Sequence, residues 1–255
     1  MSIVIIGILV VGALFSLIYF SSTQVLTRNF SFNPPQDTTG TYRSISIFNV
    51  DGLAIIQPWS LSSIHINGTV TAKGLGASLS MVSLSNSTGS GDVVFRASFP
   101  VSGGFFFSQS YLVSINVFVP STIRLASVQV SNINGGVRIM NLNATAINLS
   151  SVNGALSISC ISCQTVTALS TSGNIAANLS TLATNGSYNL TTTNANIGFT
   201  APASSSFKLK ADRSVSCTFP GCNASGQGVF TQTFGSGNAT VTLNSAYGQV
   251  AISGT

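Results

Sequence analysis

Apolar and polar residues alternate through most of the chain after residue 44, and the alternation returns as one repeated phrase. The phrase consists of an alternating strand, a polar turn that ends at a glycine, and a second alternating strand. Because successive side chains of a strand point to opposite faces, each phrase predicts two strands with one apolar face. The copies read SISIFNVDGLAII at residues 44–56, VQVSNINGGVRIM at 128–140, INLSSVNGALSIS at 147–159, TALSTSGNIAANL at 167–179, YNLTTTNANIGFT at 188–200 and VTLNSAYGQVAIS at 241–253.

The turn glycine recurs 19, 19 and 22 residues apart within residues 128–200, with Ala195 in the last glycine position. A regular period of this size is typical of stacked repeats, in which each strand pairs with its equivalent in the next copy. Asn-Gly and Asp-Gly predict a tight corner with positive φ at glycine. We therefore expect an all-β domain over residues 44–255, either β-solenoid or β-roll-like or a stacked β-sandwich. An antiparallel meander is the alternative, and Gly74–Tyr111 does not fit the repeat.

Two of the turns carry a resemblance to a known family. Asn134-Gly135-Gly136-Val137-Arg138-Ile139 and Asn153-Gly154-Ala155-Leu156-Ser157-Ile158 resemble the repeated phrase of the DUF4097 putative-adhesin family, with Ser172-Gly173-Asn174-Ile175 a weaker match. Val119-Pro120-Ser121 is similar to the segment that often precedes these repeats. The resemblance spans about residues 45–255. It implies a β-solenoid or β-roll of short strands and an adhesive role, and it implies no catalytic residues.

The N-terminal segment is apolar on all sides. Residues 3–20 contain no charge, and as a helix they would span roughly 27 Å, close to the thickness of a bilayer core. A cleaved signal peptide would need a basic start and a small-residue cleavage site, and a buried helix would be amphipathic. We therefore expect a transmembrane α-helix within residues 1–20, followed by a polar spacer at 21–43 that contains Pro34 and Pro35.

The orientation of this span rests on two opposing signals. Arg28 and Arg43 would place the following residues in the cytoplasm by the positive-inside rule. The cysteines and an excess of glycosylation sequons favour the opposite orientation, a single-pass protein of the cell membrane with the β domain outside the cytoplasm. The candidate glycosylation sites are Asn29, Asn67, Asn86, Asn143, Asn148, Asn178, Asn185, Asn189, Asn223 and Asn238.

The four cysteines form two close pairs, Cys160 with Cys163 and Cys217 with Cys222. Two structural disulfides in an oxidising compartment are the favoured interpretation, with pairing inside each close pair. Pro220-Gly221 predicts a turn that brings Cys217 near Cys222. A four-thiolate zinc site and a redox-active pair are the alternatives, but Cys160 follows a strand and no helix N-terminus is at hand to lower its pKa.

Composition narrows the possible functions. Only 5% of residues are charged and glutamate is absent, whereas roughly 25% is usual for a soluble domain. One histidine and four aspartates offer little acid–base chemistry, so we expect no catalytic residues, no cofactor and no metal site. Asp51 and Asp92 are too scattered for paired-carboxylate chemistry, and His65 is expected to be an ordinary surface residue. The net charge of +5 is dispersed along the chain, which argues against nucleic-acid binding.

Phe105, Phe106 and Phe107 form an unusual aromatic run. It is interpreted as closing one end of the core, with an exposed interaction patch as the alternative.

The whole pattern predicts a membrane-anchored, glycosylated surface protein for structure or adhesion, partnered by the lipid bilayer and by copies of itself, other surface proteins or glycans. A subunit of an extracellular filament or envelope lattice, an accessory subunit of a membrane complex and a glycan-cleaving solenoid are the alternatives. Scarce charge suits a hot or acidic exterior, such as an archaeal surface.

Overall fold

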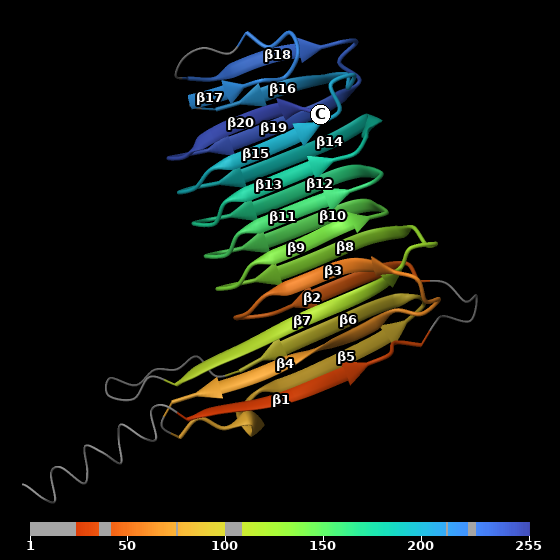
Figure 1. Cartoon of the computed structure of the whole chain (residues 1–255), viewed down its shortest axis with the longest axis vertical. Coiled ribbons are helices and arrows are strands. Elements are labelled where there is room, and N and C mark those ends of the chain that lie inside the picture. Colours follow the sequence, from red (N-terminus) through yellow and green to blue (C-terminus); the bar gives the residue numbers. More distant parts are fainter. Residues whose placement is uncertain (1–23, 36–41, 75, 100–108, 213, 224–227) are drawn as a thin grey trace, which may run out of the picture.

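The computed structural model describes residues 24–35, 42–74, 76–99, 109–212, 214–223 and 228–255. These residues form two ten-stranded sheets that pack face to face into an elongated prism (Figure 1). Sheet A contains, in spatial order, β1 (Val25–Phe32), β4 (His65–Lys73), β7 (Ser110–Pro120), β3 (Ala54–Trp59), β9 (Val137–Leu142), β11 (Leu156–Cys160), β13 (Ile175–Leu179), β15 (Ile197–Ala201), β20 (Gln249–Gly254) and β17 (Ser214–Cys217). Sheet B contains β18 (Phe230–Phe234), β16 (Phe207–Ala211), β19 (Ala239–Ser245), β14 (Leu182–Thr192), β12 (Cys163–Ser170), β10 (Ala144–Ser151), β8 (Leu125–Asn132), β2 (Ser44–Phe48), β6 (Asp92–Ser98) and β5 (Ser83–Gly89).

Each repeated phrase forms one coil, which is a strand of sheet B followed by a strand of sheet A. Equivalent strands of neighbouring coils pair in parallel, as β10 does with β8 and β12, and β11 does with β9 and β13. The inward residues of both sheets form one continuous apolar core. The expected all-β, solenoid-like stacking is therefore confirmed, and the parallel pairing excludes an antiparallel meander.

The spatial order of the coils differs from their order in the chain at both ends. The first coil, β2–β3, lies between β6–β7 and β8–β9. After β3 the chain therefore runs to the end of the stack, forms β4 to β7 there, and returns to form β8 on the other side of the first coil. At the other end, the last coil, β19–β20, lies between β14–β15 and β16–β17. The C-terminal residues therefore complete the interior of the stack rather than its end.

Antiparallel strands close the two ends of the parallel stack. β4 and β1 continue sheet A beyond β7, and β5 pairs with β6. β18 pairs with β16 at the opposite end. The prediction of a polar spacer over residues 21–43 was wrong for Val25–Phe32, because this segment forms β1. The irregular Gly74–Tyr111 section supplies the short 3-10 helix η1 (Leu79–Met81), β5 and β6, which explains why it does not fit the repeat.

The turn glycines lie at a corner where successive coils touch. A Cβ on Gly154 would lie 1.9 Å from the carbonyl oxygen of Gly135, and a Cβ on Gly173 would lie 1.9 Å from that of Gly154. Gly52 has positive φ, but Gly135, Gly154 and Gly173 do not. The expectation of positive φ was therefore wrong for these three positions. Glycine is needed there because the backbones of stacked coils approach too closely for a side chain.

A ladder of buried polar side chains joins the coils at the same corner. The hydroxyl of Ser151 donates to the Gly135 oxygen at 3.1 Å and accepts from the Gly154 amide at 2.9 Å. Buried backbone groups are costly when unpaired, so each hydroxyl stabilises two of them. Equivalent donations to the preceding coil come from Asn132, Ser170, Thr192 and Ser245.

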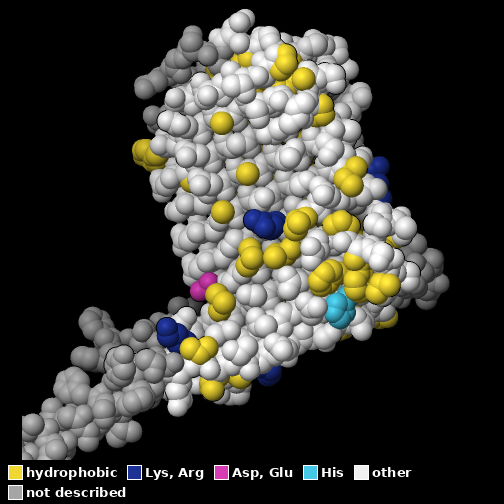
Figure 2. Space-filling view, in the orientation of Figure 1, with side chains coloured by type: hydrophobic (Ala, Val, Ile, Leu, Met, Phe, Trp, Pro, Cys, Tyr) yellow, Lys and Arg dark blue, Asp and Glu magenta, His cyan; other side chains and the backbone are white. Residues whose placement is uncertain are grey.

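The described surface carries few charged side chains, as Figure 2 shows for one face. Among the residues that the structure describes, no helix is long and apolar enough to cross a membrane. Residues 3–20, for which the sequence predicts such a helix, lie outside the described ranges.

Candidate binding surface

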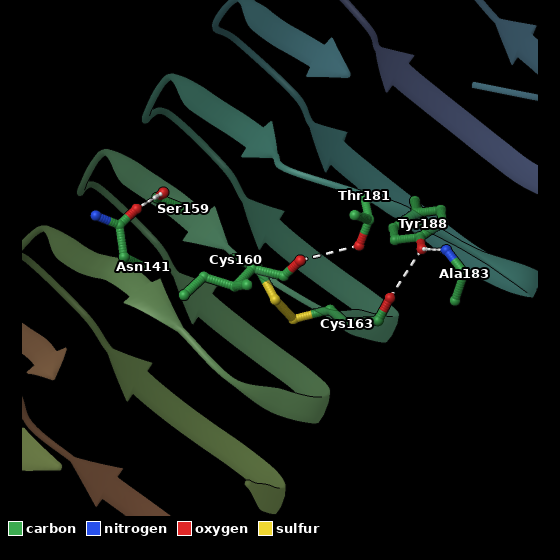
Figure 3. The surroundings of a disulfide bond; sticks show 8 residues. Asn141, Ser159, Cys160, Cys163, Thr181, Ala183 and Tyr188 are labelled. Atoms are coloured by element: carbon green, nitrogen blue, oxygen red, sulfur yellow. Dashed lines mark hydrogen bonds between the residues drawn. A yellow bond between two sulfur atoms is a disulfide. The ribbon is translucent and has the colours of Figure 1, made fainter. Parts of the chain in front are cut away.

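The disulfides form within the two close pairs of cysteines. Cys160, at the end of β11, is bonded to Cys163, at the start of β12, and the bridge closes the corner opposite the glycine corner (Figure 3). Cys217, at the end of β17, is bonded to Cys222, and Gly221 in the turn between them has positive φ. All four sulfurs are in disulfides, which leaves no free thiolate for the zinc alternative.

Tyr188 connects the next coil to this disulfide corner. Its buried hydroxyl donates to the Cys163 carbonyl oxygen at 2.8 Å and accepts from the Ala183 amide at 2.8 Å (Figure 3). Burial raises the pKa of the phenol, because the charged form would lose its hydration. Thr181 makes a second link at the same corner, from its exposed hydroxyl to the Ile161 carbonyl oxygen at 2.9 Å.

Replacing Tyr188 with phenylalanine is expected to lower the free energy of unfolding by about 1–3 kcal/mol, since the buried Cys163 carbonyl and the partly buried Ala183 amide lose their partner. Thr181→Ala removes one exposed hydrogen bond at the same corner and is expected to cost less than about 0.5 kcal/mol. Urea denaturation of the two variants measures the difference. Equal losses of unfolding free energy in the two variants would show that burial does not determine how much the Tyr188 hydrogen bonds contribute to stability.

The described acidic residues lie apart from one another. Asp92 accepts a hydrogen bond from Ser44 at 2.6 Å, and desolvation raises the pKa of Asp51 at its corner. A shallow hollow of about 770 Å³ near the C-terminal end is lined by Asp212, with no second acid and no histidine among its described lining residues. Within the described ranges, no three residues of metal-binding type come together.

The ten sequon asparagines all lie in described segments; seven are exposed, and Asn67, Asn143 and Asn189 are half-buried, with Asn143 Oδ1 shielded from solvent. Asn148 and Asn189 point outward from sheet B, and Asn178 points outward from sheet A. Their side chains are therefore placed where a glycan would have room, and attachment itself remains a prediction. Phe105, Phe106 and Phe107 lie outside the described residues.

The outward face of sheet B consists largely of neutral hydrogen-bonding groups in rows that cross the strands. One row contains Ser46, Gln129, Asn148, Thr167, Asn189 and Thr242, each opposite the next in the register. Neighbouring strands in a sheet lie roughly 4.8 Å apart. The row therefore repeats similar donors and acceptors at a regular spacing along the prism.

Sheet A carries an aromatic group near the end where β3, β4 and β7 meet. Trp59 and His65 are nearly parallel, with ring centroids 5.5 Å apart, and Phe118 lies 5.3 Å from Trp59 and 5.9 Å from His65. We call these three residues the ring cluster. All three are partly exposed, and Figure 2 shows hydrophobic side chains gathered beside the histidine.

Amide side chains surround the ring cluster. His65 Nδ1 lies 2.5 Å from Asn33 Oδ1, and His65 Nε2 lies 3.2 Å from Asn67 Nδ2. Asn116 Nδ2 in turn donates to Asn67 Oδ1 at 3.3 Å. The contacts match a tautomer in which Nδ1 donates to Asn33 Oδ1 and Nε2 accepts from Asn67 Nδ2.

The expectation that His65 is an ordinary surface residue was wrong in one respect. Its ring does point away from the buried Ile64 and Ile66, but it stacks on Trp59 and hydrogen-bonds to neighbouring amides. The sequence held a signal for this site, because Phe118 lies between the inward Val117 and Val119 and so must face outward. Phe118 is thus an aromatic residue at an outward position of β7, two residues after the outward Asn116.

Comparison with known proteins gives one family and several structures of similar fold. The profile of the Toastrack DUF4097 family matches residues 41–253. A "putative cell adhesion protein" from Clostridium sporogenes aligns over 91% of this chain and 100% of its own, with 14% identity and a TM-score of 0.55. A "putative adhesin" from Bacteroides fragilis aligns over 91% and 98%, with 10% identity and a TM-score of 0.35. No curated protein matches the chain.

Proposed function

The chain belongs to the Toastrack DUF4097 family, and from this premise we propose that it is a non-catalytic adhesion protein displayed on the outer surface of a cell membrane. The apolar segment at residues 3–20 anchors it, and the β prism projects away from the bilayer. It binds through the neutral outward faces of its two sheets. Each contact is weak, and many copies acting together give firm attachment.

The single observation that carries this proposal is the row of neutral polar side chains across sheet B. Six parallel strands present hydroxyl or amide groups in register, from Ser46 to Thr242. A repeated surface of this kind suits a repeated partner, because equivalent contacts recur along both molecules. The scarcity of charge also suppresses long-range repulsion between neighbouring copies.

Three further features support an extracytoplasmic location. The two disulfides belong to the chemistry of oxidising compartments. Seven of the ten sequon asparagines are exposed, which glycosylation would require. The Clostridium structure of similar fold is named as a cell adhesion protein, and the same role is proposed here for this chain.

The absence of catalysis in the proposal is supported by how the acids are placed. Paired-carboxylate cleavage of a glycan needs two carboxyl groups across one cleft. Asp92 is held by Ser44 on the face of sheet B, whereas Asp212 lies in the hollow without a second acid among the described lining residues.

Adhesion of cells that lack the protein tests the proposal. Such cells are expected to attach less to surfaces and to one another, and the wild-type chain restores attachment. A variant with Gln129→Lys and Thr167→Lys, which charges the row on sheet B, is expected to restore it severalfold less well. The matched control, Ser121→Lys with Thr122→Lys, adds the same charge at the exposed turn between β7 and β8 and should restore attachment fully. Equal attachment with and without the protein would contradict the proposal.

A further inference from the structure

We propose that the outward face of β3, β4 and β7 is a binding site for a neutral saccharide, with the ring cluster as its apolar base and the amides of Gln57 and Asn116 as its hydrogen-bonding edge. The inference rests on the proposed function in one respect, since an adhesion protein needs a ligand. It adds a place on the molecule and a chemical class.

The aromatic rings supply the first half of such a site. The face of an aromatic ring carries partial negative charge, which attracts the positively polarised C–H groups on the flat side of a sugar ring. Trp59 has the largest ring, and its partial exposure leaves area for this contact. Binding sites for small molecules combine apolar walls with a few placed polar groups in the same way.

The ring cluster stands out against the rest of the sheet A surface. Farther along the stack, the outward row that contains Arg138 continues through Ser157, Ala176, Gly198 and Ala251. Large apolar side chains are absent from that row, and the exposed Leu112 of β7 and Met140 of β9 are aliphatic rather than aromatic. Three rings held together at a partly exposed position leave apolar surface in contact with water, a feature that often marks a binding site.

The amides supply the second half of the site. Gln57 lies opposite Phe118 in the register of β3 and β7, and Asn116 lies opposite Asn67 in that of β4 and β7. Among the described residues, the Gln57 amide and Asn116 Oδ1 have no hydrogen-bond partner, and both residues are partly exposed. An amide offers a donor and an acceptor side by side, which matches two neighbouring hydroxyls of a sugar.

Cations on this face are too sparse for a polyanionic ligand. In the outward row through Asn67, Asn116 and Ile55, the next residue is Arg138, and no acidic residue lies in that row. A polyanion such as nucleic acid would need several cations to bind. A neutral saccharide needs only the apolar base and the amides.

A structural role for the same rings makes a different prediction. Trp59 Nε1 donates to the Ser63 carbonyl oxygen at 2.9 Å, which holds the connection between β3 and β4. Removal of the ring would therefore destabilise this turn whether or not a ligand binds. For that reason the decisive variants alter the amide edge and leave the rings in place.

Trp59 is the only tryptophan of the chain, so its fluorescence reports directly on the site. We expect the full-length protein in detergent to change its emission when titrated with neutral hexasaccharides of glucose, mannose or galactose. A sulfated hexasaccharide should cause no change. Gln57→Ala and Asn116→Ala are each expected to weaken binding about fivefold, the loss of roughly one hydrogen bond. Gln57→Ala should not lower the melting temperature, whereas Asn116→Ala also removes the hydrogen bond to Asn67. Asn194→Ala, which removes an exposed amide in the turn between β14 and β15, should leave binding unchanged.

Three results would overturn the inference. These are no response to any of the neutral hexasaccharides, equal binding by the Gln57 and Asn194 variants, or a glycan attached to Asn67 in the native protein, which would displace the amide that contacts His65. The proposed function and this inference can be contradicted independently of each other. If the purified protein binds saccharide but cells attach equally without it, adhesion is wrong, and if cells need it but no saccharide binds, the ring site alone is wrong.

Discussion

Gly154→Ala is expected to lower the free energy of unfolding by about 3 kcal/mol, the upper part of the usual range for overpacking a tight site. The new Cβ would lie 1.9 Å from the Gly135 carbonyl oxygen and 2.3 Å from its carbonyl carbon. Both are backbone atoms of a stacked coil and cannot rotate away. The shift would also strain the hydrogen bonds that Ser151 and Ser170 make with Gly154.

Gly198→Ala is the matched control for this variant. Gly198 lies in β15, and a Cβ built there meets no atom within 4 Å. The same substitution is expected to be neutral or to stabilise the protein by less than about 1 kcal/mol, through the unfolded chain. Urea denaturation of both variants measures the contrast. If they unfolded alike, close approach of the coils would not be the reason for glycine at the corner.

Leu243→Asp is expected to abolish cooperative folding, with a cost of about 4 kcal/mol or more for a buried unpaired charge. Leu243 is fully buried in β19, which is the last strand of sheet B along the chain yet lies between β14 and β16. The variant therefore disturbs both neighbouring coils. Circular dichroism and solubility would report the loss.

Thr242→Asp places the same new charge at an outward position of the same strand. Thr242 points outward and lies opposite Lys210 in the register of β16 and β19, so the new charge stays in water near a cation. A change of less than about 0.5 kcal/mol is expected. Similar damage from Thr242→Asp and Leu243→Asp would contradict the placement of the last coil inside the stack.

Much of the central stack could be predicted from the sequence. Alternation identified the inward residues, such as Ile147 and Leu149, and the period of the turn glycines identified the coils from residue 128 to 200. Short spacing within each cysteine pair was enough for the local disulfides. These features depend on neighbouring residues or on a constant repeat, which a single sequence displays.

The order of the coils could not be predicted in this way. The phrases that form β2–β3 and β19–β20 have the same pattern as the others, so each would fit at several levels of the stack. Their insertion depends on the connecting segments and on the antiparallel strands β1, β5 and β18, whose pairing is long-range. The reason for glycine at the corner could not be predicted either. It is the close contact between the backbones of neighbouring coils, and not a positive φ of the glycine itself.

The ring cluster shows a similar limit at the candidate site. Trp59, His65 and Phe118 come from three strands, and Asn33 lies beyond the end of β1, a segment interpreted from its composition as a spacer. Alternation alone places each ring on an outward face. Only the neighbouring positions of β3, β4 and β7 in sheet A bring the three rings together.

Labelling of intact cells tests the central claim, that the β prism is displayed outside the membrane. The chain has three lysines, Lys73, Lys208 and Lys210, and all are exposed on the prism. A membrane-impermeant amine reagent, followed by peptide mass spectrometry, is expected to modify all three before the cells are broken. Modification only after lysis would place the prism on the inner side and contradict the account.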